Sequence, residues 1–279
     1  MILTAKAADG TQARAIDEGG GTPAVLVLHP GLDDGASWAA VAARLAAHHR
    51  VVRLHRRRYR LDLDRQTPCT VAQEVEHTLA VAEAMGAGPV VLAAHSSGAV
   101  IALEALVAAP SAFAGAVLYE PPVVIGTPLG GPDGEVHRRA RAAIAAGRPG
   151  RAMRIFVRDT VRMPGWVALL SGLFVAVVPR MRALAPRQIE DNAAMDELGV
   201  RLDAYARISM PVVLLGGDRS PAHLGERLDA LERVLPGARR VLLTGQGHTA
   251  HAKAPDRVAE VVAGLAAEVA REAGEAGES

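Results

Sequence analysis

The sequence is poor in cysteine, in aromatic residues and in net charge. It has one cysteine among 279 residues, Cys69, so no internal disulfide can form and no cysteine-based metal cluster is possible. Aromatic residues make up 3% of the chain while 50% of it is hydrophobic, which predicts a core built from Ala, Val and Leu. The formal net charge is +1, with acids and bases mixed along the chain, which predicts neither nucleic acid nor a membrane surface as a partner.

Long apolar segments are also missing. The longest run, 166–178, is interrupted by Ser171 and Gly172 and is too short to span a bilayer. The first residues lack the basic and then apolar pattern of a secretory signal, so we expect a cytoplasmic protein. The basic stretch 55–60 is short, and we expect a solvated loop there rather than a binding patch.

An alternation of strand-length apolar runs with helical patterns is what the chain does contain. Two short strands are expected within 1–17, and further strands near 24–28, 51–54, 89–94, 115–119, 211–216 and 240–243. Helices are expected from Ser37, as its cap, to about His48, and from Thr70, also as a cap, to Met85. Further helices are expected at 97–108, 221–235 and 255–273. This order predicts an α/β fold with a mostly parallel, doubly wound sheet. Residues 123–207 lose the alternation, which predicts a helical insertion between two parts of one core, 1–122 and 208–279.

A candidate nucleophile follows the apolar run 89–94. The chain continues as Ala-His-Ser-Ser-Gly (94–98) and then as an Ala/Leu-rich helical pattern. Strand, sharp turn and helix, with Ser96 at the apex between small residues, is the form of a nucleophile elbow, G-x-S-x-G, in which Ala94 replaces the first glycine. The alternative is an ordinary strand-to-helix connection in which the serines cap the helix.

A serine hydroxyl needs a base to take its proton, and the base is usually a histidine. His248 follows the last strand in the flexible loop Gly-Gln-Gly-His, and His251 is a weaker candidate in the same loop. The base in turn needs a carboxylate, and Glu120 and Asp218 both follow strands. Two prolines after Glu120 fix its position, whereas Arg219 could neutralise Asp218. The residues alone leave both acids open.

Two backbone N–H groups are candidates for the oxyanion hole, which stabilises the charge developing on a substrate oxygen. Ser97, directly after the candidate nucleophile, supplies one. The turn after strand 24–28 supplies the other, where Pro30 has no N–H and Gly31 does. No metal, nucleotide or flavin motif is present, which predicts that the protein uses no cofactor.

The motifs, in their chain order, resemble the α/β-hydrolase superfamily. They are strand–His-Pro-Gly followed by Trp38, then Ala-His-Ser-Ser-Gly, then Gly-Gln-Gly-His, and the resemblance covers nearly the whole chain. It implies the α/β-hydrolase fold, with 123–207 as a helical cap over the site. It also implies an oxyanion donor at Gly31, although the family commonly has His-Gly where this chain has His29-Pro30.

The acid is where the chain departs most from the family pattern. The usual family acid would fall at Ser220, which is not an acid. Some branches carry the acid after the preceding core strand, the place that Glu120 occupies. The resemblance therefore implies a Ser96–His248–Glu120 triad with Asp218 as the reserve acid.

The expected reaction is cleavage of an ester or thioester through an acyl-enzyme, because the residue at the elbow is a serine. A small-molecule apolar acyl substrate is expected under the cap, in a pocket that includes His29, His95, Trp166, Leu170 and Phe174. Since one fold hosts many chemistries, two alternatives stay open. They are a non-hydrolytic enzyme or carbon–carbon bond cleaver (a lyase, cyclase or C–C hydrolase), and a ligand-binding protein without turnover.

Overall fold

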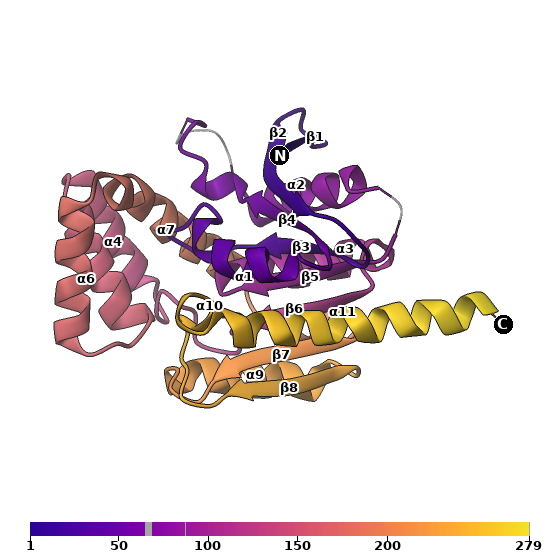
Figure 1. The fold of residues 1–279 in the computed structure, drawn as a ribbon. Helices are drawn as coiled ribbons and strands as arrows, with labels where there is room; N and C mark the ends of the chain where they lie inside the picture. The colour runs from indigo at the N-terminus through magenta and orange to yellow at the C-terminus, as the bar shows by residue number, and fades with distance from the viewer. Residues whose placement is uncertain (65–68, 87, 279) are drawn as a thin grey trace.

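The structure, a computed structural model, describes residues 1–64, 69–86 and 88–278 (Figure 1). Its sheet has eight strands in the order β1-β2-β4-β3-β5-β6-β7-β8. The pairs β1–β2 and β2–β4 are antiparallel, and every later neighbouring pair is parallel. The predicted mostly parallel sheet is thus confirmed. The strands are β1 (Ile2–Lys6), β2 (Gln12–Gly19), β3 (Ala24–Leu28), β4 (Arg50–His55), β5 (Val90–His95), β6 (Gly115–Tyr119), β7 (Val212–Gly217) and β8 (Ala238–Leu243).

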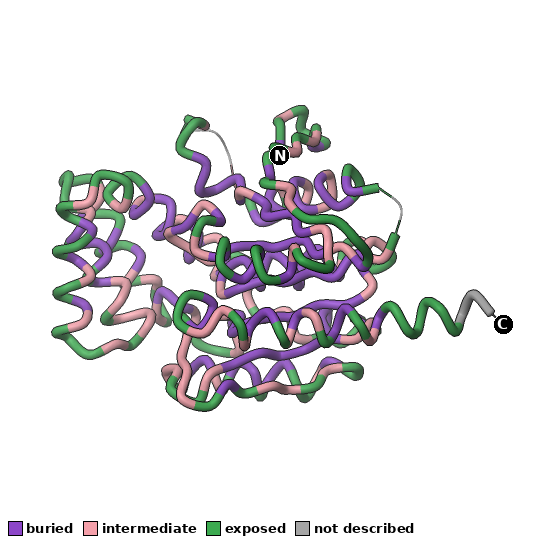
Figure 2. Tube along the Cα trace, in the orientation of Figure 1, coloured by how far each residue is buried: buried purple, intermediate pink, exposed green. Residues whose placement is uncertain are grey.

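Helices cover both faces of the sheet, as Figures 1 and 2 show. One face packs on α1 (Ala39–Leu45) and α11 (Pro255–Glu278). The other packs on α2 (Val71–Ala84), α3 (Ser97–Ala108) and α9 (Ala222–Val234). Central strands such as β5 are buried along their whole length, which explains their continuous apolar sequence.

The segment between β6 and β7 forms a separate group of helices at one end of the sheet (Figure 1). We keep the name cap for residues 123–207, the bounds predicted from the sequence. Its helices are α4 (Glu135–Ala145), α5 (Pro149–Ile155), the π-helical turn η4 (Phe156–Thr160), α6 (Gly165–Val177), α7 (Pro179–Leu198) and α8 (Leu202–Tyr205). No single helix of the described residues is long and apolar enough to cross a membrane, and α6 and α7 reach that length only as a pair bent by 118°.

Helix starts follow local hydrogen bonding, and one prediction about them is wrong. Thr70 caps α2 as predicted, because its hydroxyl accepts from the Gln73 N–H while the Gln73 side chain accepts from the Thr70 N–H. Ser37 does not cap α1. It lies inside the 3-10 turn η1 (Ala36–Trp38), and its hydroxyl donates to Asp33 Oδ2 at 2.7 Å.

The predicted solvated basic loop at 55–60 is also wrong. Arg56, Arg57, Arg58 and Arg60 are all buried, with at most 6% of each residue exposed. They lie in and around the 3-10 turn η2 (Arg57–Tyr59), directly after β4. Because β4 ends inside the molecule, Arg56 and Arg58 reach carboxylates of α2 and α7 and the Cys69 carbonyl. Arg57 instead donates to the Thr11 hydroxyl, and Arg60 donates to the Gln12 carbonyl and to Asp62. The remaining short 3-10 turn is η3 (Pro110–Ala112), and α10 (Ala250–Lys253) precedes α11.

Candidate active site

Ser96 occupies a strained turn between β5 and α3. Its φ of 54° and ψ of −127° lie in a region of backbone conformation that residues other than glycine rarely adopt. The turn is held because the Ser96 N–H donates to the Tyr119 carbonyl and the Ser96 carbonyl accepts from the Ala99 N–H, both at 2.8 Å. The geometry is that of a nucleophile elbow, which projects the hydroxyl away from the sheet.

Gly98 explains why the elbow needs a glycine at its second small position. A Cβ atom there would lie 2.4 Å from the His29 carbonyl oxygen and 2.7 Å from that of Leu28. Neither backbone oxygen can move without disturbing β3, so α3 can approach the sheet only with glycine at 98. At the first small position Ala94 is fully buried within β5, and an alanine side chain fits there.

His248 and Glu120 come together at the carboxyl ends of β8 and β6. The His248 Nδ1 lies 2.6 Å from Glu120 Oε2, and Glu120 Oε1 accepts from the Gly217 N–H at 2.8 Å. Both carboxylate oxygens are thus engaged, and Glu120 is 1% exposed. This pairing favours the tautomer of His248 that carries its proton on Nδ1 and has Nε2 as an acceptor.

Asp218, the reserve acid, turns away from His248. It is exposed, and its Oδ1 accepts from the Gly245 N–H at 2.7 Å. Asp218 therefore fastens the first residue of the histidine loop to the end of β7. Of the two acids that the sequence left open, Glu120 is the one in contact with the histidine.

Contacts at Gly217 and at Tyr119 position the loop that carries His248. A Cβ atom at Gly217 would lie 2.3 Å from the Gln246 carbonyl oxygen, so the loop can lie this close to β7 only because residue 217 is glycine. From the other side the Tyr119 hydroxyl donates to the Gly247 carbonyl and accepts from the Ala250 N–H. Tyr119, the last residue of β6, thus holds the histidine loop, and Glu120, the next residue, supplies the carboxylate.

Buried aromatic and imidazole rings pack behind the pair. The His95 ring stacks on Tyr119 with centroids 4.3 Å apart and lies 4.6 Å from the His248 ring. Burial holds the pKa of His95 well below its usual range, and the neighbouring His248 and His251 add to the effect. Burial also lowers the pKa of His251, which stacks on Trp38, to about 4. At neutral pH these two rings are uncharged, so they add no positive charge beside His248.

A cavity of about 480 Å³ opens between the elbow, the histidine loop and the cap. Ser96, Ser97 and His248 line its floor. Its walls are apolar side chains, mostly from the cap: Leu129, Phe156, Val157, Val161, Met163, Val167, Met195 and Leu224. Ionisable and amide groups also reach it, namely Gln188, Asn192, Arg219, His223 and Lys253. The site therefore combines a serine on a strained turn, a histidine paired with a carboxylate, and an apolar chamber.

The five predicted pocket residues do not line this cavity. His29 and His95 are buried beneath it, His95 because it is the last residue of β5 and faces the opposite side of the sheet from the cavity. Trp166, Leu170 and Phe174 lie on the outer side of α6 and are more than half exposed. The helix turns other side chains inward, and Val167 and Ser171 line the cavity in their place.

The two oxyanion candidates, Ser97 and Gly31, have different surroundings. Ser97 lines the cavity at the start of α3, while Gly31 lies against Gln188 of α7. A Cβ atom at Gly31 would be 1.9 Å from Gln188 Oε1, so a larger residue here would displace the Gln188 side chain. Behind the turn, His29 accepts at Nε2 from the Arg56 N–H at 3.0 Å, so its Nδ1–H donates to the Pro30 carbonyl at 2.7 Å.

Arg56 is the part of the site that the sequence analysis missed. Its guanidinium donates to Ser97 Oγ at 2.7 Å, to Glu74 Oε2 at 2.6 Å and to Asp191 Oδ1 at 3.0 Å. Burial alone would lower the pKa of Arg56, but the Asp191 and Glu74 carboxylates raise it, so the group stays charged. The Tyr59 hydroxyl also donates to Asp191, at 2.8 Å.

This buried ion network links three distant parts of the chain. Glu74 belongs to α2, Arg56 follows β4, and Asp191 belongs to the cap helix α7. In the sequence, one signal could have indicated this network. It is the run of three arginines directly after a buried strand, a position where a solvated loop is not expected. The carboxylates that pair with it lie 18 and 135 residues further along the chain, and the sequence does not connect them.

A metal centre finds no support in the described residues. No group of three or more His, Cys, Asp or Glu side chains there could hold a metal ion.

The comparisons place the chain in a family. A model described as "Alpha/beta hydrolase family" matches residues 25–261, and the chain belongs to that family. A solved α/β hydrolase from Sphaerobacter thermophilus is 31% identical, with a TM-score of 0.77, covering 93% of this chain and 98% of that one. A search of curated protein sequences finds no match.

More distant solved structures share the fold. An esterase from Thermogutta terrifontis is 19% identical with a TM-score of 0.72, covering 96% of this chain and 99% of that one. A 2-hydroxy-6-oxo-6-phenylhexa-2,4-dienoate hydrolase from a Rhodococcus strain is 21% identical with a TM-score of 0.67, covering 94% and 97%. The fold is thus the α/β-hydrolase fold, and the family indicates a hydrolase.

Proposed function

We propose that the protein is a cofactor-independent serine hydrolase that cleaves an ester or thioester through an acyl-enzyme. The observation that carries the proposal is the 2.6 Å contact between His248 and the buried Glu120, at the cavity that Ser96 lines from its elbow. The family and the esterase among the solved relatives support a reaction of this class.

In the proposed reaction Ser96 Oγ attacks the substrate carbonyl carbon and His248 Nε2 takes the hydroxyl proton. Glu120 keeps the Nδ1 proton in place and stabilises the imidazolium that forms. The N–H groups of Ser97 and Gly31 stabilise the oxyanion, each contributing about 2.7–4 kcal/mol to lowering the barrier. His248 then returns its proton to the leaving alcohol or thiol. A water molecule, activated by the same base, releases the acid from Ser96.

The apolar walls of the cavity support a small to medium acyl group as the part of the substrate held under the cap. A cavity of about 480 Å³ lies within the usual range for small-molecule sites. A panel of acyl esters and thioesters of graded chain length tests this, with turnover expected to fall once the chain exceeds the chamber.

The nucleophile is tested with a fluorophosphonate probe. We expect the probe to label Ser96 and Ser96→Ala to abolish labelling, with kcat falling by about 10⁶-fold. The exposed Ser111 gives a matched control, and Ser111→Ala keeps full labelling. Unchanged turnover in Ser96→Ala would falsify the proposal. Turnover that depends on Ser96 without an acyl-enzyme detectable by mass spectrometry would instead favour non-hydrolytic or carbon–carbon chemistry.

A further inference from the structure

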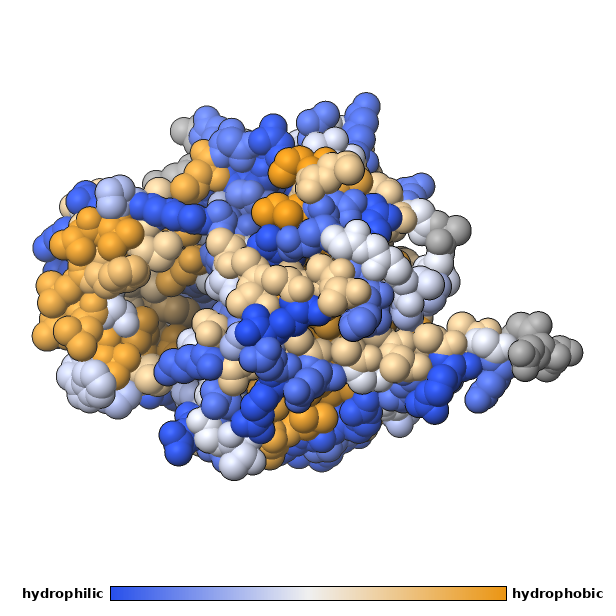
Figure 3. Space-filling model, viewed as in Figure 1, coloured by the Kyte–Doolittle hydropathy of each residue, from blue (hydrophilic) through white to orange (hydrophobic). Residues whose placement is uncertain are grey.

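The outer side of α6 carries large apolar side chains that nothing in the described chain covers. Six of them are 44–73% exposed: Trp166, Leu169, Leu170, Leu173, Phe174 and Val177. Figure 3 shows hydrophobic side chains gathered on the cap, at the end of the molecule that α6 occupies in Figure 1. We call these six residues the α6 face. A contiguous apolar patch of this kind marks an interaction surface.

The composition of α6 sets it apart from an ordinary surface helix. Its thirteen residues, GWVALLSGLFVAV, include no charged side chain. A surface helix in a globular protein normally pairs one apolar stripe with a polar one. Here Ala168, Gly172 and Val175 are buried, and the stripe that faces away from them is equally apolar. The outer side chains of α6 are therefore suited to contact with an apolar medium.

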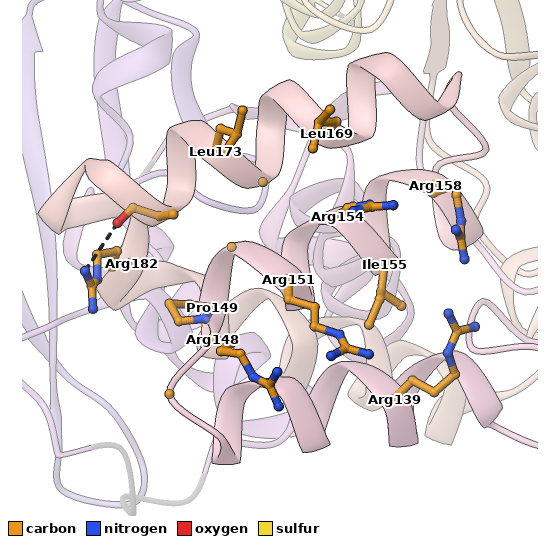
Figure 4. A pocket seen from close by; sticks show the side chains of 14 residues that line it. Arg139, Arg148, Pro149, Arg151, Arg154, Ile155, Arg158, Leu169, Leu173 and Arg182 are labelled. Carbon is orange, nitrogen blue, oxygen red and sulfur yellow. Dashed lines mark hydrogen bonds between the residues drawn. The ribbon is translucent and has the colours of Figure 1, made fainter.

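Next to the α6 face lies an arginine-lined groove of about 640 Å³. Figure 4 shows the groove between α6 and the arginines of α4, α5 and the adjoining turns, with Arg182 of α7 at one end. Leu169 and Leu173 belong both to the groove and to the α6 face. The groove has no acidic lining residue, and its arginines are Arg139, Arg148, Arg151, Arg154, Arg158 and Arg182.

Most of this positive charge is not balanced locally. Arg139 and Arg158 share the carboxylate of Asp159, at 3.1 and 2.6 Å, and Arg139 also lies 4.0 Å from Glu135, which Arg138 shares. Arg182 donates to the Ala176 carbonyl, which carries no charge. No ion pair in the described part of the chain involves the three arginines that remain, Arg148, Arg151 and Arg154. Exposed guanidinium groups beside an apolar helix favour an occupant that is both apolar and anionic.

We propose that the α6 face and the arginine-lined groove dock the cap onto an anionic lipid bilayer, with the arginines on the phosphate headgroups and the α6 face in the acyl boundary. An apolar helix flanked by basic residues that lies in the interface plane is the arrangement of monotopic membrane binding. The helix is too short to span the bilayer. The net charge of +1 predicted no membrane partner, and the proposal departs from that prediction. The net charge is a sum over the whole chain, so it does not reveal a cap that is basic by itself.

A second copy of the chain fits this surface less well. In a two-fold contact the same patch faces itself, which would bring the unpaired arginines of one cap close to those of the other. Like charges at close range repel, and no acidic side chain lines the groove to offset them. A bilayer with anionic headgroups matches both the charge and the apolar face.

Docking in this way would bring the catalytic cavity next to the lipid. The inner side of α6 contributes Val167 and Ser171 to the cavity, so a single helix separates the chamber from the docking surface. An apolar acyl compound dissolved in the bilayer would then be concentrated at the cap. The docking goes beyond the proposed hydrolysis, and vesicle binding measures it without any turnover.

The experiment is co-sedimentation of the purified protein with phosphatidylcholine vesicles, with and without 30–40% phosphatidylglycerol, at about 50 mM and about 500 mM salt. We expect binding to the anionic vesicles only, weakened at high salt. Arg151→Glu/Arg154→Glu should reduce the partition coefficient about 25-fold or more, since each basic residue near the surface contributes about five-fold. Leu170→Ser/Phe174→Ser should reduce it at least about ten-fold through lost apolar burial.

Matched controls carry the same chemical changes away from the cap. Arg233→Glu/Arg271→Glu reverses two exposed charges, and Leu242→Ser removes an exposed apolar side chain on β8. Both controls should bind like the wild type. Equal binding to neutral and anionic vesicles, no binding to either, or equal losses in the controls would each overturn the proposal. So would a concentration-dependent dimer, seen by sedimentation velocity, that Leu170→Ser/Phe174→Ser abolishes, because the occupant would then be a second copy.

Discussion

Glu120 and Asp218 follow neighbouring strands, β6 and β7, yet their carboxylates have different partners. Glu120 holds His248 and the Gly217 N–H from a buried position, while Asp218 holds the Gly245 N–H from an exposed one. The first geometry controls the tautomer of the histidine. The second only fastens the loop.

Glu120→Gln and Asp218→Asn separate these roles. In Glu120→Gln the amide NH₂ can face His248 Nδ1, which moves the imidazole proton to Nε2 and removes the base. We expect kcat to fall by about 10⁴-fold, as for loss of a triad carboxylate, with little change in KM. Asp218→Asn keeps an oxygen for the Gly245 N–H and should lower kcat less than about ten-fold. A larger loss in Asp218→Asn than in Glu120→Gln would contradict the assignment.

At this scale the sequence predicts the place of a residue well when the course of the backbone decides it. Ser96, Glu120 and His248 all follow parallel strands, whose carboxyl ends meet at one edge of the sheet. It predicts poorly when the direction of a side chain decides. His95 precedes Ser96 yet points into the core, and Arg56 finds its carboxylates on two other elements.

Among the elements, α7 has the most consequences, because it joins the cap to the core through Asp191. That carboxylate is buried and accepts from Arg56 and Tyr59, and Arg58 lies 3.3 Å away. Burial would raise the pKa of Asp191, but Arg56 and Arg58 lower it, so it remains ionised at neutral pH.

Asp191→Ala leaves two buried guanidinium groups short of a partner. We expect the free energy of unfolding to fall by about 3–5 kcal/mol, measured by urea denaturation. Glu190→Ala is the matched control on the same helix, because Glu190 pairs with Arg141 at the surface, and it should cost at most about 1 kcal/mol. Similar losses in both variants would show that the buried network does not hold the cap.

The sequence predicts best those strands and helices whose pattern of apolar residues continues without interruption. Strands such as β5 and helices such as α2, with its cap at Thr70, follow from apolar runs and capping residues. The orientation of α6 does not follow, because a helix that is apolar all round gives no period from which to choose the inner side. The prediction of Trp166, Leu170 and Phe174 as pocket residues failed for that reason.

The whole molecule carries several buried histidines whose pKa is depressed by burial. The pKa values of His29, His77 and His251 each fall to about 4. An unfolded chain has an ordinary histidine pKa of about 6.5. Between these two values the unfolded state binds protons that the folded state does not, so stability is lost as the pH falls from about 6.5 to about 4.

Each of these histidines should contribute a slope of about 1.4 kcal/mol per pH unit to the free energy of unfolding within that window. Urea denaturation at pH 7, 6 and 5 measures the slope. His77→Gln keeps an oxygen that can accept from Arg57 while removing one titrating group, and it should reduce the slope by one such increment. The exposed His48 supplies the control, His48→Gln. A slope that His77→Gln leaves unchanged would contradict the assignment to buried histidines.

The contact between Asp191 and Arg56 has a consequence for recombination between related enzymes. Asp191 lies in the cap by chain order, yet it completes an ion network whose other charged members, Arg56, Arg58 and Glu74, belong to the core. A chimaera that exchanges all of 123–207 would separate these charges, whereas one that exchanges only 123–178 keeps α7 with its partners. The natural unit of exchange in this protein is therefore α4 to α6, the part of the cap that carries the α6 face and all the arginines of the groove except Arg182.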